Sequence, residues 1–164
     1  MDQLLKKDFN GDEDTQKDLF LTFRIEREDY GMEICHVIEI IGIQKITELP
    51  DMPEYIKGVI NLRGSVIPVM DVRLRFNMEE RAYDERTCVV VVRVAENTIG
   101  LVVDRVNEVA EIPGAQIEPP PRTSKHHNSF IKGMGKIGDS VKILLDMEKL
   151  ILDEELVVPE VEPA

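Results

Sequence analysis

Residues 55–71 read YIKGVINLRGSVIPVMD, and residues 130–146 read FIKGMGKIGDSVKILLD, a related stretch 75 positions further along the chain. Each stretch holds two short apolar runs around a glycine-containing centre, Arg63-Gly64-Ser65 in the first and Gly138-Asp139-Ser140 in the second. Glycine at these centres permits the positive φ angles that tight hairpins need. The sequence therefore predicts two β-hairpins at equivalent places in the chain.

The similarity continues upstream of both hairpins, at an offset of 69 positions. The matched pairs are Phe23-Arg24-Ile25 with Val92-Arg93-Val94, Gly31 with Gly100, Val37 with Val106, and Glu39 with Glu108. At the downstream end, Asp71 matches Asp146, and both stand where the N-cap of a short helix is expected. An ordered series of matches along two segments predicts a duplicated structural unit.

The repeat divides the chain into two β-rich units, residues 18–78 and 87–152, and each is predicted to form a small barrel. A lone unit of about 60 residues buries only about 60% of its unfolded surface and is marginally stable. We therefore expect the two barrels to pack against each other and to leave an apolar seam. The connector, residues 79–86, contains no Gly or Pro that would make it a loose tether.

The charge of the chain limits its partners. Its 164 residues carry 20 Lys and Arg against 32 Asp and Glu, a formal net charge of −12, which argues against a nucleic-acid partner. Much of the acid lies in two predicted flexible tails, residues 1–17 and 153–164. The longest apolar run, Cys88–Val92, is far shorter than the roughly 18 residues that cross a bilayer. We expect a cytoplasmic protein without direct membrane insertion.

No residue pattern predicts catalysis, a cofactor or a metal. The run 133–138 matches G-x-G-x-x-G, but it lies inside a predicted hairpin, whereas the dinucleotide fingerprint must open a helix. His126-His127 has no cysteine or acid at ligand spacing. Cys35 and His36 are neighbours whose side chains should point to different faces of a strand or helix. A small ligand-binding enzyme built on the glycine run and His126-His127 is the alternative from another class.

Two charged residues have both a structural and a functional interpretation. Arg63 at a hairpin tip is either solvated or presented to a partner by a rigid turn. Glu39 lies within an apolar stretch and is expected either at the rim of a groove or in an ion pair. The apolar residues considered with them either belong to the core or line the seam between the barrels: Leu21, Ile34, Val37, Ile40 and Val106.

The stretch 55–71, and above all its Asn61-Leu62-Arg63-Gly64 segment, closely resembles the signature of CheW-type chemotaxis coupling proteins. Residues 100–106 and 144–150 look like the second-half counterparts of that signature. The resemblance covers about residues 18–152. It implies two five-stranded SH3-like barrels and a non-enzymatic adaptor between chemoreceptors and the chemotaxis histidine kinase, recruited to membrane-bound receptor arrays. A CheW-like regulatory module of a kinase or of a larger regulator is the alternative within the family.

The resemblance also implies two sets of contact residues. For the helical hairpin tip of a chemoreceptor they are Leu21, Ile34, Val37, Glu39, Ile40, Asn61, Arg63 and Val106. For the regulatory domain of the kinase they are Ile46 and Leu49 and, by the internal repeat, Ile117 and Glu118. The second loop departs from the family pattern at Pro119-Pro120-Pro121 and lacks a basic residue near Glu118.

Overall fold

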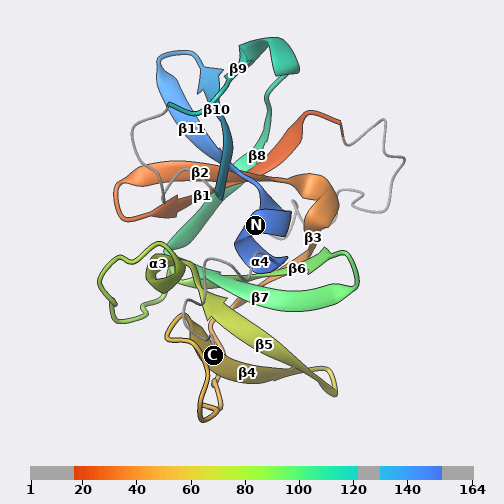
Figure 1. The fold of residues 1–164 in the computed structure, drawn as a ribbon, viewed down its shortest axis with the longest axis vertical. Coiled ribbons are helices and arrows are strands. Elements are labelled where there is room, and N and C mark those ends of the chain that lie inside the picture. Colours follow the sequence, from red (N-terminus) through yellow and green to blue (C-terminus); the bar gives the residue numbers. More distant parts are fainter. Residues whose placement is uncertain (1–16, 122–129, 153–164) are drawn as a thin grey trace, which may run out of the picture.

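The computed structural model describes residues 17–121 and 130–152, which form two packed β-sheets with short helices (Figure 1). The predicted tails lie outside the described residues except for Lys17, as does His126-His127. The all-β prediction of two packed units is confirmed.

The six-stranded sheet has the strand order β8-β1-β2-β11-β10-β9. Its strands are β1 (Leu19–Ile25), β2 (Glu28–Glu33), β8 (Arg105–Glu111), β9 (Ile117–Glu118), β10 (Ile131–Ile137) and β11 (Ser140–Leu145). The five-stranded sheet has the order β3-β6-β7-β5-β4. Its strands are β3 (Val37–Gly42), β4 (Ile56–Leu62), β5 (Ser65–Asp71), β6 (Cys88–Val94) and β7 (Asn97–Val103). The helical segments are η1 (Ile34–His36), α3 (Val72–Arg75), η2 (Gly114–Gln116) and α4 (Met147–Leu152).

The two halves of the sequence exchange their first hairpins. The hairpin β1–β2 joins β8, β10 and β11 of the second half, and the hairpin β6–β7 joins β3, β4 and β5 of the first. The boundaries 18–78 and 87–152 thus describe the repeat, but the observed pairing differs from the prediction that each half forms its own barrel. The reason is burial: β1 and β6 each have five of their seven residues buried, on both faces of the strand, and a strand in an isolated small barrel exposes one face.

The exchange depends on two equivalent glycines. Parallel pairing joins β11 to β2 at Leu144↔Gly31 and β5 to β7 at Val69↔Gly100, which are the same contact in the two copies. A Cβ atom at Gly31 would lie 2.9 Å from Leu144 Cδ2, and one at Gly100 would lie 2.7 Å from a Val89 methyl carbon. Both positions therefore need glycine for close packing, which accounts for the match seen in the sequence.

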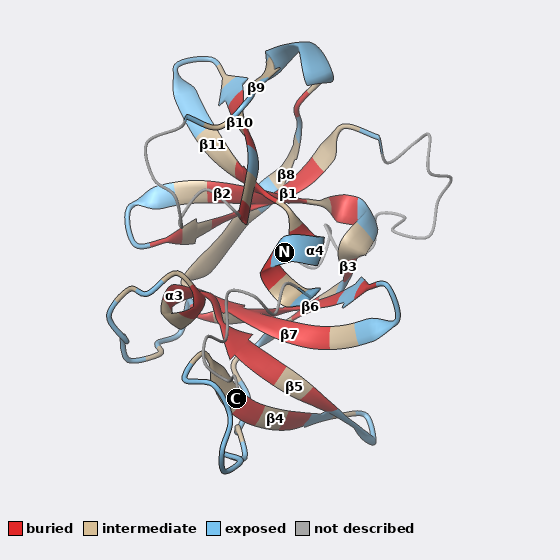
Figure 2. Ribbon diagram, in the orientation of Figure 1, coloured by how far each residue is buried: buried red, intermediate tan, exposed pale blue. Residues whose placement is uncertain are grey.

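The buried apolar residues form three clusters, and Figure 2 shows buried positions along strands of both sheets. The central core lies between the sheets and takes one face of β1 (Leu21, Phe23, Ile25) and one face of β6 (Val90, Val92, Val94). The opposite faces of these strands point into their own barrels, where Phe20 packs with Ile112 and Leu144, and Val89 and Val91 pack with Ile60 and Val69. The strands β1, β6 and β7, each with five buried residues out of seven, are the most deeply buried strands.

Arg75 contacts equivalent residues of the two halves. Its guanidinium carbon is 4.6 Å from the ring centroids of both Tyr55 and Phe130, which are equivalent residues of the repeat. Its Nε donates a 2.9 Å hydrogen bond to the carbonyl of Leu150, the residue equivalent to Arg75 itself. Arg75 is 5% exposed. One cation thus stacks on an aromatic ring from each half and joins α3 to α4 through its hydrogen bond to Leu150.

The connector 79–86 is held against the five-stranded barrel. Tyr83 donates a 2.7 Å hydrogen bond to Asp71 Oδ2, and Arg81 pairs with Asp104 at 3.3 Å. Arg73 binds the same Asp104 carboxylate through two hydrogen bonds of 2.9 and 2.6 Å. Burial alone would raise the pKa of Asp104, but the hydrogen bonds from Arg73 and the Glu26 N–H, with the guanidinium charges, bring it below its usual value.

Candidate functional site

The turn between β4 and β5 places Arg63 at the tip of a rigid hairpin. Arg63 and Gly64 have φ angles of 51° and 90°, and they lie between the paired residues Leu62 and Ser65, as in a type I′ turn. Asn61 Oδ1 accepts a 2.8 Å hydrogen bond from the Gly64 N–H and stabilises the turn. A residue other than glycine in the left-handed region is strained, and strain of this kind often marks a functional position.

Arg63 and Glu39 form an ion pair, although β3 and β4 lie at opposite edges of the five-stranded sheet. The barrel closes because Thr47, beyond β3, pairs with Val59 of β4 through two 2.9 Å hydrogen bonds. The Arg63 side chain is 67% exposed and that of Glu39 is 20% exposed. Of the two interpretations of Glu39, the structure supports the ion pair, and it brings together two residues that are 24 positions apart.

A β-bulge lies beside Glu39. Val37 pairs with Val92 and Glu39 pairs with Val91, so Ile38 is an extra residue, and it is 43% exposed. The second copy has the same bulge in β8, where Asn107 is the extra residue. Bulges of this kind change the direction of a side chain at functional surfaces. Ile38 was not singled out in the sequence, where nothing distinguishes it from its apolar neighbours.

Four predicted groove residues lie in the core instead of on the surface. Leu21, Ile34, Val37 and Ile40 are between 0 and 6% exposed and belong to the central core. These four side chains therefore offer almost no surface to a partner in this conformation. Val106 is half-buried at the edge of the same core, so it is the one apolar member of the predicted set with accessible surface.

The predicted kinase-contact residues lie on the two segments that close the barrels. Ile46 packs over Gly58 of β4, and Ile117 packs over Gly133 of β10, which confirms that the two isoleucines hold equivalent places. Leu49 is 42% exposed, and exposed Glu118 pairs with Lys136 at 2.6 Å. The strands that these segments close, β4 and β10, belong to sheets at opposite ends of the long axis (Figure 1).

The seam between the barrels also holds an apolar cavity of about 290 Å³. It is lined by Tyr30, Arg75, Phe76, Asn77, Met78, Phe130, Ile131 and Ile143. Sequence analysis predicted a seam groove but assigned other residues to it. The cavity is lined by Phe76, which follows the four-residue α3, whereas the equivalent residue Ile151 lies within the six-residue α4 and does not line it.

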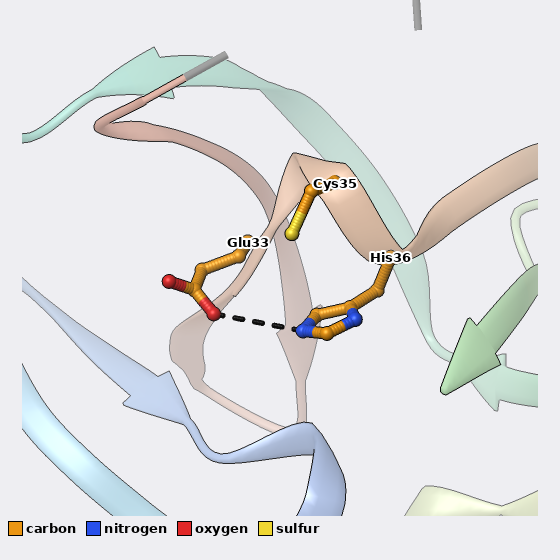
Figure 3. A group of neighbouring side chains, drawn as sticks. All are labelled: Glu33, Cys35 and His36. Atoms are coloured by element: carbon orange, nitrogen blue, oxygen red, sulfur yellow. Dashed lines mark ion pairs between the residues drawn. The ribbon is translucent and has the colours of Figure 1, made fainter. Parts of the chain in front are cut away.

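Glu33, Cys35 and His36 come together at the η1 turn (Figure 3). The carboxylate, thiol and imidazole donor atoms all lie within 4.8 Å of one another. The prediction that Cys35 and His36 point to different faces is wrong, because η1 is a single 3₁₀ turn that belongs to neither a strand nor an α-helix. The hydrogen bond from His36, followed by the contact with Lys132, lowers the pKa of Glu33 to about 2.

The glycine run 133–138 belongs to the β10–β11 hairpin and opens no helix, as predicted. Gly133 lies at a register shift, where a Cβ atom would be 3.0 Å from the carbonyl oxygen of Glu118. A Cβ atom at Gly135 would be 3.0 Å from a methyl group of Ile112. These glycines serve strand packing, and the spacing that resembles a nucleotide fingerprint has a structural cause.

Comparison with known proteins identifies relatives over most of the chain. The model of the CheW-like domain matches residues 19–155, which include every strand in the described part of the chain. The chemotaxis protein CheW of Klebsiella aerogenes is 38% identical over 138 residues, covering 84% of this chain and 83% of that protein. The CheW of Helicobacter pylori is 33% identical over 132 residues, with 80% of each chain covered.

A solved structure has the same fold. The crystal structure of the scaffolding protein TtCheW from Thermoanaerobacter tengcongensis superposes with a TM-score of 0.77 at 34% identity. The match covers 82% of this chain and 92% of that one. Among the residues that the structure describes, none belongs to a helix with the length and apolar character needed to span a membrane.

Proposed function

Because the chain belongs to the CheW-like domain family, it has the role of an adaptor in chemotaxis, and we propose that it joins the cytoplasmic tips of chemoreceptors to the regulatory domain of the chemotaxis histidine kinase. The observation that carries the proposal is the family match, which runs through both exchanged hairpins and includes the Arg63 turn. In this proposal the protein catalyses no reaction and acts by presenting surfaces, in arrays of membrane-bound receptors.

The receptor surface in this proposal is centred on Arg63. The side chain projects from a turn whose backbone is restrained by Asn61, so little conformational freedom is lost when a partner binds. Glu39 pairs with the guanidinium and orients it, while Ile38 and Val106 supply accessible apolar area. A helical hairpin would contact the apolar residues and place a polar edge against Arg63.

The buried members of the predicted receptor set have an indirect role in the proposal. Leu21, Ile34, Val37 and Ile40 form the layer on which the bulge of β3 rests. Substitutions there would change receptor binding by displacing Glu39 and Ile38, and they would lower stability at the same time.

The kinase surfaces in this proposal are the two closing segments, with Ile46 and Leu49 on one barrel and Ile117 and Glu118 on the other. Equivalent segments on two barrels give one adaptor two similar ends. Contacts of this head-to-tail kind can close into a ring in which adaptor and kinase domains alternate. Several modest interfaces would then act together through a raised effective concentration.

Binding of each partner should be separable by single substitutions. Arg63→Glu should abolish capture of a receptor-tip helical hairpin and leave capture of the kinase regulatory domain unchanged. Arg27→Glu is the matched control, since Arg27 is an exposed arginine in the β1–β2 turn. Leu49→Ser should give the opposite pattern, with Val141→Ser as its control, because Val141 is 48% exposed and lies on the other sheet.

Pull-down with purified partners measures both effects. Receptor capture that survives Arg63→Glu, or that is lost equally with Arg27→Glu, would show that the Arg63 turn is not the receptor surface. Kinase capture that is unaffected by Leu49→Ser would remove the closing segment of the five-stranded barrel from the kinase surface.

A further inference from the structure

We propose that Glu33, Cys35 and His36 form a binding site for a zinc-class divalent metal ion, a function that is separate from the adaptor role. The three residues come from the end of β2 and from η1, immediately before the β3 bulge. Among the residues that the structure describes, these three form the group of at least three His, Cys, Asp or Glu side chains that could hold a metal ion, and their donor atoms all lie within 4.8 Å of one another.

The geometry of the turn brings the donors to one side. Val37 N–H bonds the carbonyl of Ile34, which closes a 3₁₀ turn with three residues per turn. Residues three apart eclipse each other in such a turn, so Glu33 and His36 share a face, and Glu33 Oε1 lies 3.5 Å from His36 Nε2. In a tetrahedral zinc site with bonds of 2.0–2.3 Å, two donor atoms are about 3.5 Å apart. The carboxylate and imidazole therefore already have the required separation.

The chemistry of the donors favours zinc over calcium or magnesium. The set combines one sulfur, one nitrogen and one oxygen donor, whereas the hard cations prefer oxygen alone. Figure 3 shows the three side chains pointing toward a common space. Three protein ligands leave the fourth tetrahedral position to water, and Cys35 is exposed, so an ion can enter from solvent.

The carboxylate is also held as a metal ligand would be. Lys132 Nζ lies 3.1 Å from Glu33 Oε2, so one oxygen is bound from β10 while the other faces His36. Ligands in metal sites are commonly oriented by such outer partners. The positive charge of Lys132 opposes a cation, which favours exchangeable over permanent binding.

The second half of the protein provides an internal comparison. The residues equivalent to Glu33, Cys35 and His36 are Val102, Asp104 and Arg105. There a valine and an arginine replace two donors, and Asp104 is bound by Arg73. The ligand set is therefore not needed for the repeat fold, and its presence in one copy calls for a separate explanation.

Titration of the full-length protein with CoCl₂ and ZnCl₂ tests the proposal. We expect one Co²⁺ per chain, with a near-ultraviolet thiolate-to-cobalt band that Zn²⁺ abolishes by displacement. Cys35→Ser should remove the band, and His36→Gln and Glu33→Gln should each weaken binding at least about tenfold, the lower limit for loss of an outer partner. Cys88→Ser and the double variant His126→Gln, His127→Gln are matched controls that should bind as the wild type does.

Circular dichroism of the metal-free variants checks that each is folded, which the exposure of Cys35 leads us to expect. The proposal is overturned by the absence of stoichiometric binding to the wild type, by a cobalt band that persists in Cys35→Ser, or by binding that is lost in either control variant. None of these readouts depends on receptor or kinase binding, so failure here is distinguishable from failure of the adaptor proposal.

Discussion

Replacing Arg63 by glycine should remove receptor binding and leave the protein more stable than replacing it by alanine. Arg63 has a φ angle of 51°, and Gly138, its equivalent in the second copy, has a φ angle of 57°. The turn thus needs a left-handed residue in both hairpins, and in one of them an arginine takes that conformation. The informative comparison is Arg63→Gly with Arg63→Ala, because both variants lack the ion pair with Glu39.

The expected difference follows from two opposing terms. The left-handed conformation costs a residue with a Cβ atom roughly 1–2 kcal/mol, and glycine avoids this cost. Glycine loses more backbone entropy on folding, which costs roughly 0.5–1 kcal/mol relative to alanine. The glycine variant should therefore be more stable than the alanine variant by about 0.5–1 kcal/mol. For a chain of this length that corresponds to a Tm difference of about 1–4 °C.

Thermal and urea unfolding measure the stability difference, and pull-down with a receptor-tip hairpin measures binding. Both variants should fail to capture the receptor to the same extent, since each lacks the guanidinium. A glycine variant no more stable than the alanine variant would refute the assignment of strain to the turn. Retained receptor capture in either variant would show that the side chain is not a contact.

Other predictions concern Arg75, the closure of the five-stranded barrel and the half-buried carboxylate of Asp104. Arg75→Ala should lower the free energy of unfolding by about 3 kcal/mol or more in urea, because it removes two desolvated cation–π contacts and leaves a carbonyl of α4 without that hydrogen bond. Gly58→Ala should cost about 2 kcal/mol or more, since its Cβ would lie 2.1 Å from a carbonyl oxygen at a φ of 147°, whereas Gly42→Ala, with no atom within 4 Å, should be nearly neutral. The pKa of Asp104 is lowered in the folded state, so the stability that its ionised form contributes is complete above the unfolded pKa of about 3.9 and is lost as the pH falls below that value. Urea unfolding at a series of pH values should therefore show a smaller loss of unfolding free energy in acid for Asp104→Asn than for the wild type. An unchanged pH profile would contradict the pairing with Arg73.

Much of the candidate site was accessible to sequence analysis because its residues lie close together in the chain. The Asn61–Gly64 turn is local, and so are the helix N-caps, where Asp71 accepts from the N–H of Arg73 and Asp146 from that of Lys149. The pairing of Arg63 with Glu39 depends on barrel closure across a whole sheet, and sequence analysis left two interpretations of Glu39 open.

The Glu33, Cys35 and His36 cluster was missed because its donors meet on a single 3₁₀ turn. Rules for strands and helices assign neighbouring side chains to different faces, and no periodic pattern distinguishes so short a turn.

The amino-acid sequence alone determined the repeat, the β-rich character and the family, since these depend on which residue follows which. Matches such as Gly31 with Gly100 and Asp71 with Asp146 persist because each copy must meet the same local steric and hydrogen-bonding demands. Tertiary structure alone decided which strands share a barrel and which apolar residues reach the surface. Both depend on how strands that are buried on two faces find partners to cover each face, and in the observed exchange of hairpins Leu21 and Val37 lie in the core.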